Sequence, residues 1–270
     1  MTTGEGPVGW QWIRRQLGAP APSPSMRALA VPSPFDFARQ ALLCLPREAP
    51  DPKRDRMGFD AFVVATLARV VRAAGGRTLG LFTSTRMARG AGEGLRATAR
   101  DLGVRLLVQG DAPRSQLVAR FKQDETSVLC GTASLWTGVD VQGAACVVVL
   151  IDKLPFAPPG DPVLDALCER AKARTGKDLA GFFEESLPRA VLALRQGVGR
   201  LIRATEDWGC VVLCDPRLTS KGYGADIVRS LGMPARVRDV SEACAWLEKG
   251  VARMVAARES GSAERSGTHG

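Results

Sequence analysis

Short apolar runs alternate with longer segments of helical periodicity through most of this sequence. The apolar runs lie at 77–84, 104–110, 127–132, 145–152 and 209–215. Parallel strands need a crossover of about a dozen residues, usually a helix, whereas antiparallel neighbours can be joined by a short turn. The fourth run contains three consecutive valines, which suit a strand that is covered on both faces. The alternation therefore predicts an α/β fold with a mostly parallel central sheet flanked by helices.

The two ends of the chain differ in composition from this alternating core. Residues 1–34 carry much of the proline and glycine and predict an extended lead-in with, at most, a short helix at 10–17. Residues 35–257 contain the alternating pattern and predict one domain. Residues 258–270 are polar, and we expect them to be disordered.

Further segments add strands to the predicted sheet and helices to its faces. Residues 38–45 are predicted to form an edge strand, and residues 232–239 a last edge strand. A long helix is expected over 185–203, ahead of the final core strand, and an amphipathic helix over 241–257.

The charge balance favours an anionic partner. Lysine and arginine number 37 against 28 aspartate and glutamate, which gives a net charge of +9. Nucleic acid is the first choice, a membrane surface the second, and a merely basic enzyme stays open. No stretch approaches the ~18 apolar residues of a membrane span, and the start lacks the pattern of a signal peptide. Seven cysteines, mostly in apolar runs, favour reduced thiols over disulfides or a metal site. We therefore expect a soluble cytoplasmic protein.

One polar face stands out on the helix predicted ahead of the last core strand. At 100° per residue, Gln196, Arg200 and Arg203 lie on one side of that helix, opposite its apolar side. Gly197 and Gly199 each cost about 1 kcal/mol relative to alanine inside a helix, and close approach of a backbone or a ligand would explain them. The sequence leaves two readings open, a solvated arginine face and an anion-binding site.

Small polar residues follow two of the predicted strands. Thr83 and Ser84 end the first core run, Thr132 ends another, and the proline-rich stretch 154–162 follows the valine run. Ligands of open α/β sheets bind beyond the carboxyl ends of the strands. We expect these three segments to share one edge of the sheet.

Three segments, in order, resemble DinG-type bacterial DNA helicases, relatives of XPD in helicase superfamily 2. "LGLFTSTRMA" resembles motif IV of these enzymes, "GTASLWTGVDVQGAACVVVLIDKLPFAPPGDP" motif V and the strand after it, and "QGVGRLIRATEDWGCVVLCDPR" motif VI and its following strand. "SPFDFARQALLCLP" resembles the segment that leads into their second motor domain. The resemblance spans about residues 33 to 218. It implies a RecA-like, three-layer second motor domain.

The resemblance also implies roles for individual residues. Arg200 and Arg203 match motif VI arginines that stabilise charge on the γ-phosphoryl group of ATP, and Gln196 would orient the nucleotide or the attacking water. Within the same two motifs, the resemblance places Gly138, Asp140 and Gly199 with the nucleotide.

Motif V and the strand ends carry the remaining implications. The segment around Asp140 couples the nucleotide state to the grip on DNA, and many family members have glutamate where this chain has Thr137. Thr83, Ser84 and Thr132 match positions that hold the phosphates of single-stranded DNA. Hydroxyl side chains near strand ends otherwise serve most often as turn formers.

The cofactors implied by the resemblance are ATP and Mg²⁺, shared with a first motor domain. The 270 residues contain no G-x-x-x-x-G-K-[ST] phosphate loop, no Asp-Glu-x-His motif for magnesium and no four-cysteine cluster for an iron–sulfur centre. Hydrolysis needs the phosphate loop and the magnesium ligand on one domain and the arginines on the other. We therefore expect an ATP-dependent DNA helicase, moving 5′ to 3′ by family analogy, whose C-terminal motor domain lacks ATPase activity by itself.

Two other functions stay open at this point. The chain could be a non-catalytic nucleic-acid-binding remnant or adaptor from a truncated or split helicase gene. A small-molecule α/β enzyme is the third possibility, but the sequence offers it no nucleophile with a general base and no dinucleotide fingerprint.

Overall fold

The computed structural model describes residues 9–18, 29, 31, 33–132, 135 and 143–266. Its centre is a seven-stranded sheet with the strand order β3-β4-β2-β5-β6-β1-β7. Every pair of neighbouring strands in it is parallel. The strands are β1 (Ala41–Cys44), β2 (Thr78–Leu81), β3 (Leu106–Val108), β4 (Val128–Gly131), β5 (Val148–Ile151), β6 (Gly209–Leu213) and β7 (Arg236–Val237).

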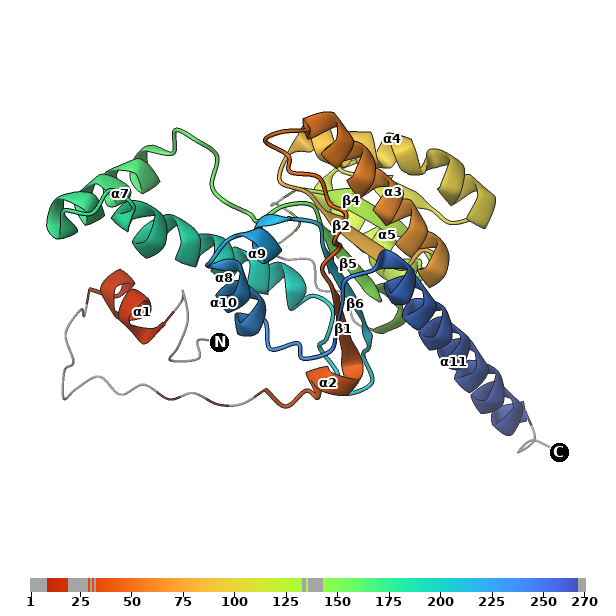
Figure 1. Ribbon diagram of the computed structural model, residues 1–270. Helices are drawn as coiled ribbons and strands as arrows, with labels where there is room; N and C mark the ends of the chain where they lie inside the picture. Colours follow the sequence, from red (N-terminus) through yellow and green to blue (C-terminus); the bar gives the residue numbers. More distant parts are fainter. Residues whose placement is uncertain are drawn as a thin grey trace.

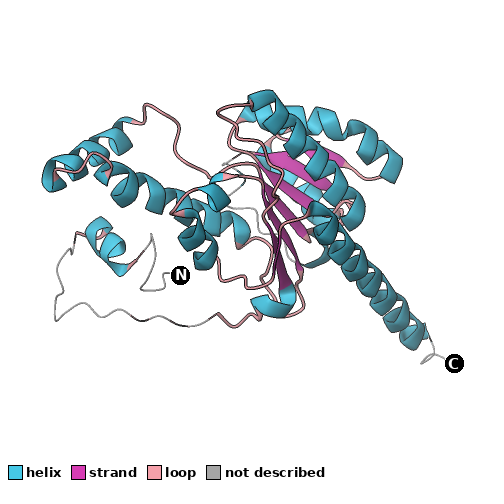
Figure 2. Cartoon of the chain, in the orientation of Figure 1, coloured by secondary structure: helices cyan, strands magenta, loops and turns pink. Residues whose placement is uncertain are grey.

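Helices cover both faces of the sheet, which makes the domain three layers thick (Figures 1 and 2). One apolar layer joins the sheet to α3, α4 and α11, and the other joins it to α5, α8 and α10. The helices are α1 (Trp10–Gln16), α2 (Phe37–Gln40), α3 (Arg56–Ala74), α4 (Thr85–Leu102), α5 (Arg114–Gln123), α7 (Pro162–Thr175), α8 (Leu187–Val198), α9 (Arg217–Ser220), α10 (Gly224–Ser230) and α11 (Val240–Ser266), with a 3₁₀ turn η1 (Gly143–Ala145) and a π-helical turn η2 (Phe182–Ser186).

The valine-rich strand β5 is central, as the sequence predicts. Val148 and Leu150 belong to the α3 layer, and Val149 and Ile151 to the α8 layer. All four side chains are buried, because a strand between two helical layers has no solvent face. The prediction of a parallel α/β fold is therefore confirmed.

Two segments lie away from the sheet. The pair formed by α7 and the start of α8 extends to one side, and α1 lies beside it (Figure 1). Trp12 of α1 is 8% exposed, and Gln16 donates a hydrogen bond to Glu185. The short helix expected within the N-terminal lead-in is present and docked. α11 extends from the opposite side of the domain.

The structure also differs from several sequence predictions. Residues 38–45 do not form an edge strand, because β1 pairs with β6 on one side and with β7 on the other. The expected last edge strand is confirmed as β7. The helix expected over 185–203 ends at Val198, and α11 continues to Ser266, into the segment expected to be disordered. Among the described residues, no helix combines the length and the apolar character that crossing a membrane requires.

Candidate functional site

The predicted site residues that the structure describes lie at two opposite edges of the sheet. Thr83 follows the carboxyl end of β2, and Thr132 follows that of β4. By contrast, residues 199–208 connect α8 to the amino end of β6. Since all strands are parallel, this connection, here called the motif VI turn, lies at the amino edge. The structure therefore separates the threonines from Arg200 and Arg203.

The carboxyl edge brings the predicted segments together. β4, β2 and β5 are neighbours in the sheet, with Gly131 and Ile151 both in register with Leu81. The segments that follow these strands therefore share one edge, which confirms the expectation for the described residues. Ser84, however, is the N-cap residue of α4, and its hydroxyl oxygen accepts a hydrogen bond from the Met87 amide at 3.2 Å.

Both threonines at this edge are held by side chains that the sequence did not single out. The amide and hydroxyl of Thr83 donate to Asp152, at 2.9 and 3.1 Å. The amide and hydroxyl of Thr132 donate to Gln109 Oε1, at 2.6 and 3.0 Å. Asp152 follows β5 directly and Gln109 follows β3 directly, so a polar residue next to an apolar run was the available signal.

Asp152 is fully buried at the end of β5. Burial raises the pKa of its carboxyl group to about 6, against the charge of Lys153 and the hydrogen bonds from the Lys153 and Thr83 amides. Asp215, at the end of β6, is buried too, where it accepts from the Leu154 amide at 2.7 Å and pairs with Arg217. Two carboxylates thus organise the carboxyl edge.

At the amino edge, Arg200 and Arg203 follow α8 instead of lying on it. Gly199 is the C-cap residue, and the amide of Arg200 donates to the Gly197 carbonyl at 3.2 Å, as in a tightened final turn. The predicted helical face through Gln196, Arg200 and Arg203 is therefore wrong. The glycines favour ending the helix here, because glycine is among the weakest helix formers.

The apolar side of that prediction nevertheless holds. Leu201 and Ile202 are 2% and 5% exposed and belong to the α8 layer of the core. Gln196 is exposed, and Arg200 and Arg203 are half-buried. The Arg203 guanidinium lies near enough to the Cys146 thiol to oppose the rise of its pKa to about 12, which burial causes.

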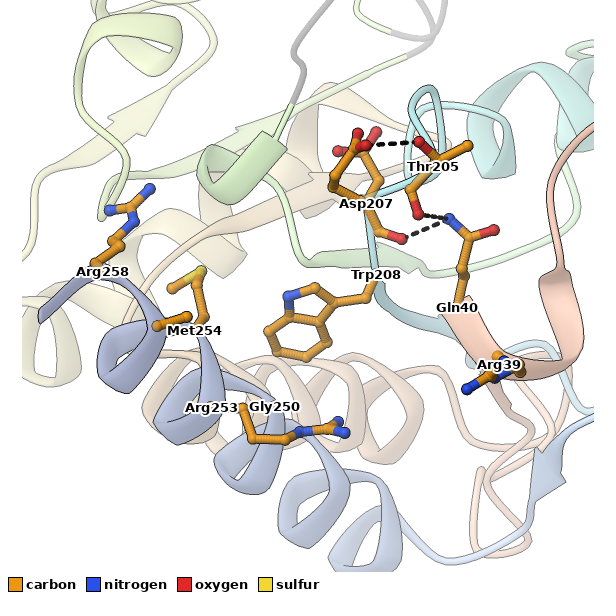
Figure 3. Close-up of a pocket in the computed structure, with 11 residues that line it drawn as sticks. Arg39, Gln40, Thr205, Asp207, Trp208, Gly250, Arg253, Met254 and Arg258 are labelled. Carbon is orange, nitrogen blue, oxygen red and sulfur yellow. Dashed lines mark hydrogen bonds between the residues drawn. The ribbon is translucent and has the colours of Figure 1, made fainter. Parts of the chain in front are cut away.

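Asp207 and Gln40 hold the motif VI turn. The Asp207 carboxylate accepts from the amides of Arg203 and Ala204, each at 2.8 Å, and from the Gly143 amide at 3.1 Å. The Gln40 side chain donates to the carbonyl oxygens of Ala204, Thr205 and Asp207 at 2.8 to 3.1 Å. Figure 3 shows the Gln40 amide directed at this turn.

A groove of about 840 Å³ runs between the motif VI turn and α11 (Figure 3). Trp208 packs against Gly250 of α11 and against Trp246. The remaining lining residues are mostly polar or charged: Arg39, Gln40, Thr205, Glu206, Asp207, Arg253, Met254, Ala257 and Arg258.

Gly138 and Asp140, together with Thr137, lie outside the described residues. In the described part of the chain, no group of three or more histidine, cysteine, aspartate or glutamate side chains could hold a metal ion. The amino edge instead offers an amide and two guanidinium groups, which suit phosphate oxygens and not a cation.

An all-parallel seven-stranded sheet with helices on both faces defines a RecA-like three-layer α/β domain. Its structure superposes on one described as an XPD helicase with a TM-score of 0.55 at 16% identity, over 74% of this chain and 35% of that one. The family model of the helicase C-terminal domain matches residues 67–233, and the chain belongs to that family. The resemblance to DinG and XPD helicases is therefore confirmed.

Two curated relatives are similar in sequence. The chain is 41% identical over 220 residues to the ATP-dependent DNA helicase YoaA of Escherichia coli (strain K12), covering 82% of this chain and 33% of YoaA. It is 42% identical over 205 residues to the ATP-dependent helicase DinG of Mycobacterium tuberculosis (strain ATCC 25618 / H37Rv), covering 76% of this chain and 30% of that protein. The chain spans about a third of the length of these relatives.

Proposed function

We propose that this chain supplies the second motor domain of an ATP-dependent DNA helicase, moving 5′ to 3′ in the cytoplasm. The observation that carries the proposal is the family match over 67–233, which includes both polar edges of the sheet. Relatives that match this chain are described as ATP-dependent DNA helicases. A motor of this kind works by closing two domains over ATP, so the edge that carries Arg200 and Arg203 needs a first motor domain as its partner.

The amino edge is the proposed nucleotide side. Arg200 and Arg203 stabilise the charge on the γ-phosphoryl group of an ATP held by the first motor domain, and Gln196 orients the nucleotide or its water. Gln196 is exposed and both arginines are half-buried, which suits groups that meet a ligand carried by another domain. Gly199 lies in the same turn, and Gly138 and Asp140 are assigned to the nucleotide on their motif alone.

Magnesium and the phosphate loop come from the first motor domain in this proposal. The sequence lacks the phosphate-loop pattern, and the amino edge offers cationic groups that would repel a metal ion. When bound, Mg²⁺ neutralises the β- and γ-phosphates. Arg200 and Arg203 of this chain would add their positive charge to that of the metal ion at the transferring group. By itself the chain therefore hydrolyses no ATP.

The carboxyl edge is the proposed track for single-stranded DNA. Thr83, Ser84 and Thr132 would contact phosphates, which suits binding that does not depend on base sequence. The amide and hydroxyl donors of both threonines are engaged by Asp152 and Gln109. DNA phosphates must therefore compete with two internal acceptors, so binding at this edge is coupled to a change of hydrogen-bond partner.

Reassembly with a first motor domain tests this function. The chain mixed with the first motor domain of E. coli YoaA is expected to hydrolyse ATP when single-stranded DNA is added. Arg200→Ala and Arg203→Ala should each lower kcat by about 10³-fold or more, as loss of an arginine finger does. Thr83→Val should raise the DNA concentration needed for half-maximal stimulation. Arg96→Ala, which removes an exposed arginine of α4 paired with Glu93, is the matched control.

The outcomes separate the proposed functions. DNA binding by the chain without restored hydrolysis would favour the non-catalytic binding module. DNA-stimulated hydrolysis by the chain alone, abolished in Arg200→Ala, would contradict the division of labour between two domains.

A further inference from the structure

Asp207 and Gln40 connect three segments that are distant in the sequence. We propose that Asp207 is a positioning residue for Arg203, and that Gln40 fixes the motif VI turn in the geometry that Asp207 requires. The proposal rests on the function proposed above, because Arg203 acts there on the nucleotide. Neither Asp207 nor Gln40 would touch ATP in this arrangement.

The carboxylate of Asp207 joins the end of the motif V segment to the motif VI turn. Its Oδ1 accepts from the Gly143 amide, which begins the turn ahead of β5, and its Oδ2 accepts from the amides of Arg203 and Ala204. Asp207 is 7% exposed, so these hydrogen bonds are shielded from water. Hydrogen bonds to an ionised acceptor are about twice as strong as neutral ones. The backbone of Arg203 is therefore fixed directly by this carboxylate.

Gln40 ties the same turn to the segment that leads into the sheet. It ends α2 immediately before β1, and its Nε2 donates to the carbonyl oxygens of Ala204 at 3.1 Å, Thr205 at 3.0 Å and Asp207 at 2.8 Å. An amide nitrogen has two hydrogens, so the three acceptors share them. The turn is thus held by its amides through Asp207 and by its carbonyls through Gln40.

This arrangement suits positioning because an arginine finger depends on its placement. A displacement of about 1 Å can cost about 10²-fold in rate. The first residue of β6 follows Asp207 closely and is fixed in the sheet by its pairing with β1. Asp207 therefore fixes the backbone of Arg203 relative to the sheet. Its hydrogen bond from the Gly143 amide also links Arg203 to the end of the motif V segment.

Spectroscopy on the full chain tests the proposal without ATP hydrolysis. In Asp207→Asn, amide hydrogen exchange at Gly143, Arg203 and Ala204 is expected to accelerate about tenfold, and NMR relaxation of the Arg203 Nε–H group should report larger motion. Glu206→Gln is the matched control. It removes an exposed carboxylate from the same turn whose hydrogen bond comes from the neighbouring Thr205 hydroxyl. Unchanged exchange and unchanged Arg203 relaxation in Asp207→Asn would overturn the proposal.

Kinetics of the reassembled motor give the second arm. Asp207→Asn is expected to lower kcat by about 10²-fold while the KM for ATP changes less than about twofold, since ATP is held by the other domain. The double variant of Asp207→Asn with Arg203→Ala should be no slower than Arg203→Ala alone. Additive losses would show that Asp207 acts independently of Arg203 and would overturn the proposal.

A second variant keeps the result decisive. Gln40→Ala leaves the carboxylate in place and should show the same pattern at smaller amplitude, so it decides the matter if Asp207→Asn does not fold. If the wild-type mixture hydrolyses no ATP, the proposed function fails and the spectroscopic arm alone decides the positioning proposal.

Discussion

Asp152 shows how one buried side chain constrains the carboxyl edge. Its carboxylate accepts from the amide and the hydroxyl of Thr83, while burial raises its pKa to about 6. The donors and Lys153 stabilise the ionised form of the carboxyl group, whereas its removal from water destabilises that form by more. The edge that we propose for DNA phosphates is thus already occupied by a negative charge.

This pKa shift predicts a specific pH dependence of stability. A carboxyl group whose folded pKa of about 6 exceeds its ordinary 3.8 stabilises the fold below pH 3.8 and loses that contribution as the pH rises through 6. The difference corresponds to roughly 3 kcal/mol. Asp152→Asn removes this titration. Between pH 4 and 6.5 the free energy of unfolding of the wild type should therefore fall relative to that of Asp152→Asn, by up to this amount.

Denaturant unfolding of both proteins across this pH range measures the effect. Subtracting one curve from the other cancels the contributions of the groups that titrate in both proteins. A difference that stays constant from pH 4 to 6.5 would show that Asp152 has an ordinary pKa.

At the scale of single elements, the sequence predicted the strands better than the places where helices end. The valine run identified β5 and its burial because residue type and burial are directly linked in a central parallel strand. The polar helical face predicted through Gln196, Arg200 and Arg203 was wrong, because the apolar periodicity continues in Leu201 and Ile202 after the helix has ended at Val198. Burial, and not helical geometry, maintains that pattern.

Pairing between strands was also beyond the reach of sequence patterns. Residues 38–45 were expected to form an edge strand, but β7, nearly two hundred residues further along the chain, pairs with β1 on its free side. Gln40 and the contact of Asp207 with Gly143 were not predicted for the same reason, since these hydrogen bonds join segments separated by more than sixty residues. The candidate residues were found by their motif, whereas the residues that hold them were found only by the fold.

α11 docks on the motif VI turn through a glycine. A Cβ atom at Gly250 would lie 2.1 Å from the Trp208 ring. Gly250→Ala is therefore expected to destabilise the fold by about 1–3 kcal/mol through overpacking, although alanine favours helix by about 1 kcal/mol. Gly90 of α4 has open space at the same position and is the matched control, since Gly90→Ala should stabilise by about 1 kcal/mol.

Thermal unfolding of the two variants checks this prediction. Because both replace a helical glycine with alanine, opposite signs of the change would isolate the Trp208 contact. Equal stabilisation in both variants would mean that α11 is not held against Trp208.

At the scale of the whole molecule, the folding unit is larger than the family match. Residues 67–233 exclude β1, β7, α11 and part of α3, yet β1 lies between β6 and β7 in the sheet. α11 contributes Val240, Ala243 and Leu247 to the core layer that contains Cys210 and Val212 of β6. The two ends of the chain therefore complete the same side of the sheet.

A polypeptide limited to residues 67–233 should fail to fold independently. Removing β1 exposes the unpaired edge of β6, and removing α11 uncovers one of its apolar faces, so the lost burial is not replaced. Near-UV circular dichroism and dispersed amide NMR signals are expected for residues 33–266 and not for 67–233. A folded, monomeric 67–233 fragment would show that the matched region is autonomous, and that β1 and α11 serve as attachments to the motor instead of parts of its core.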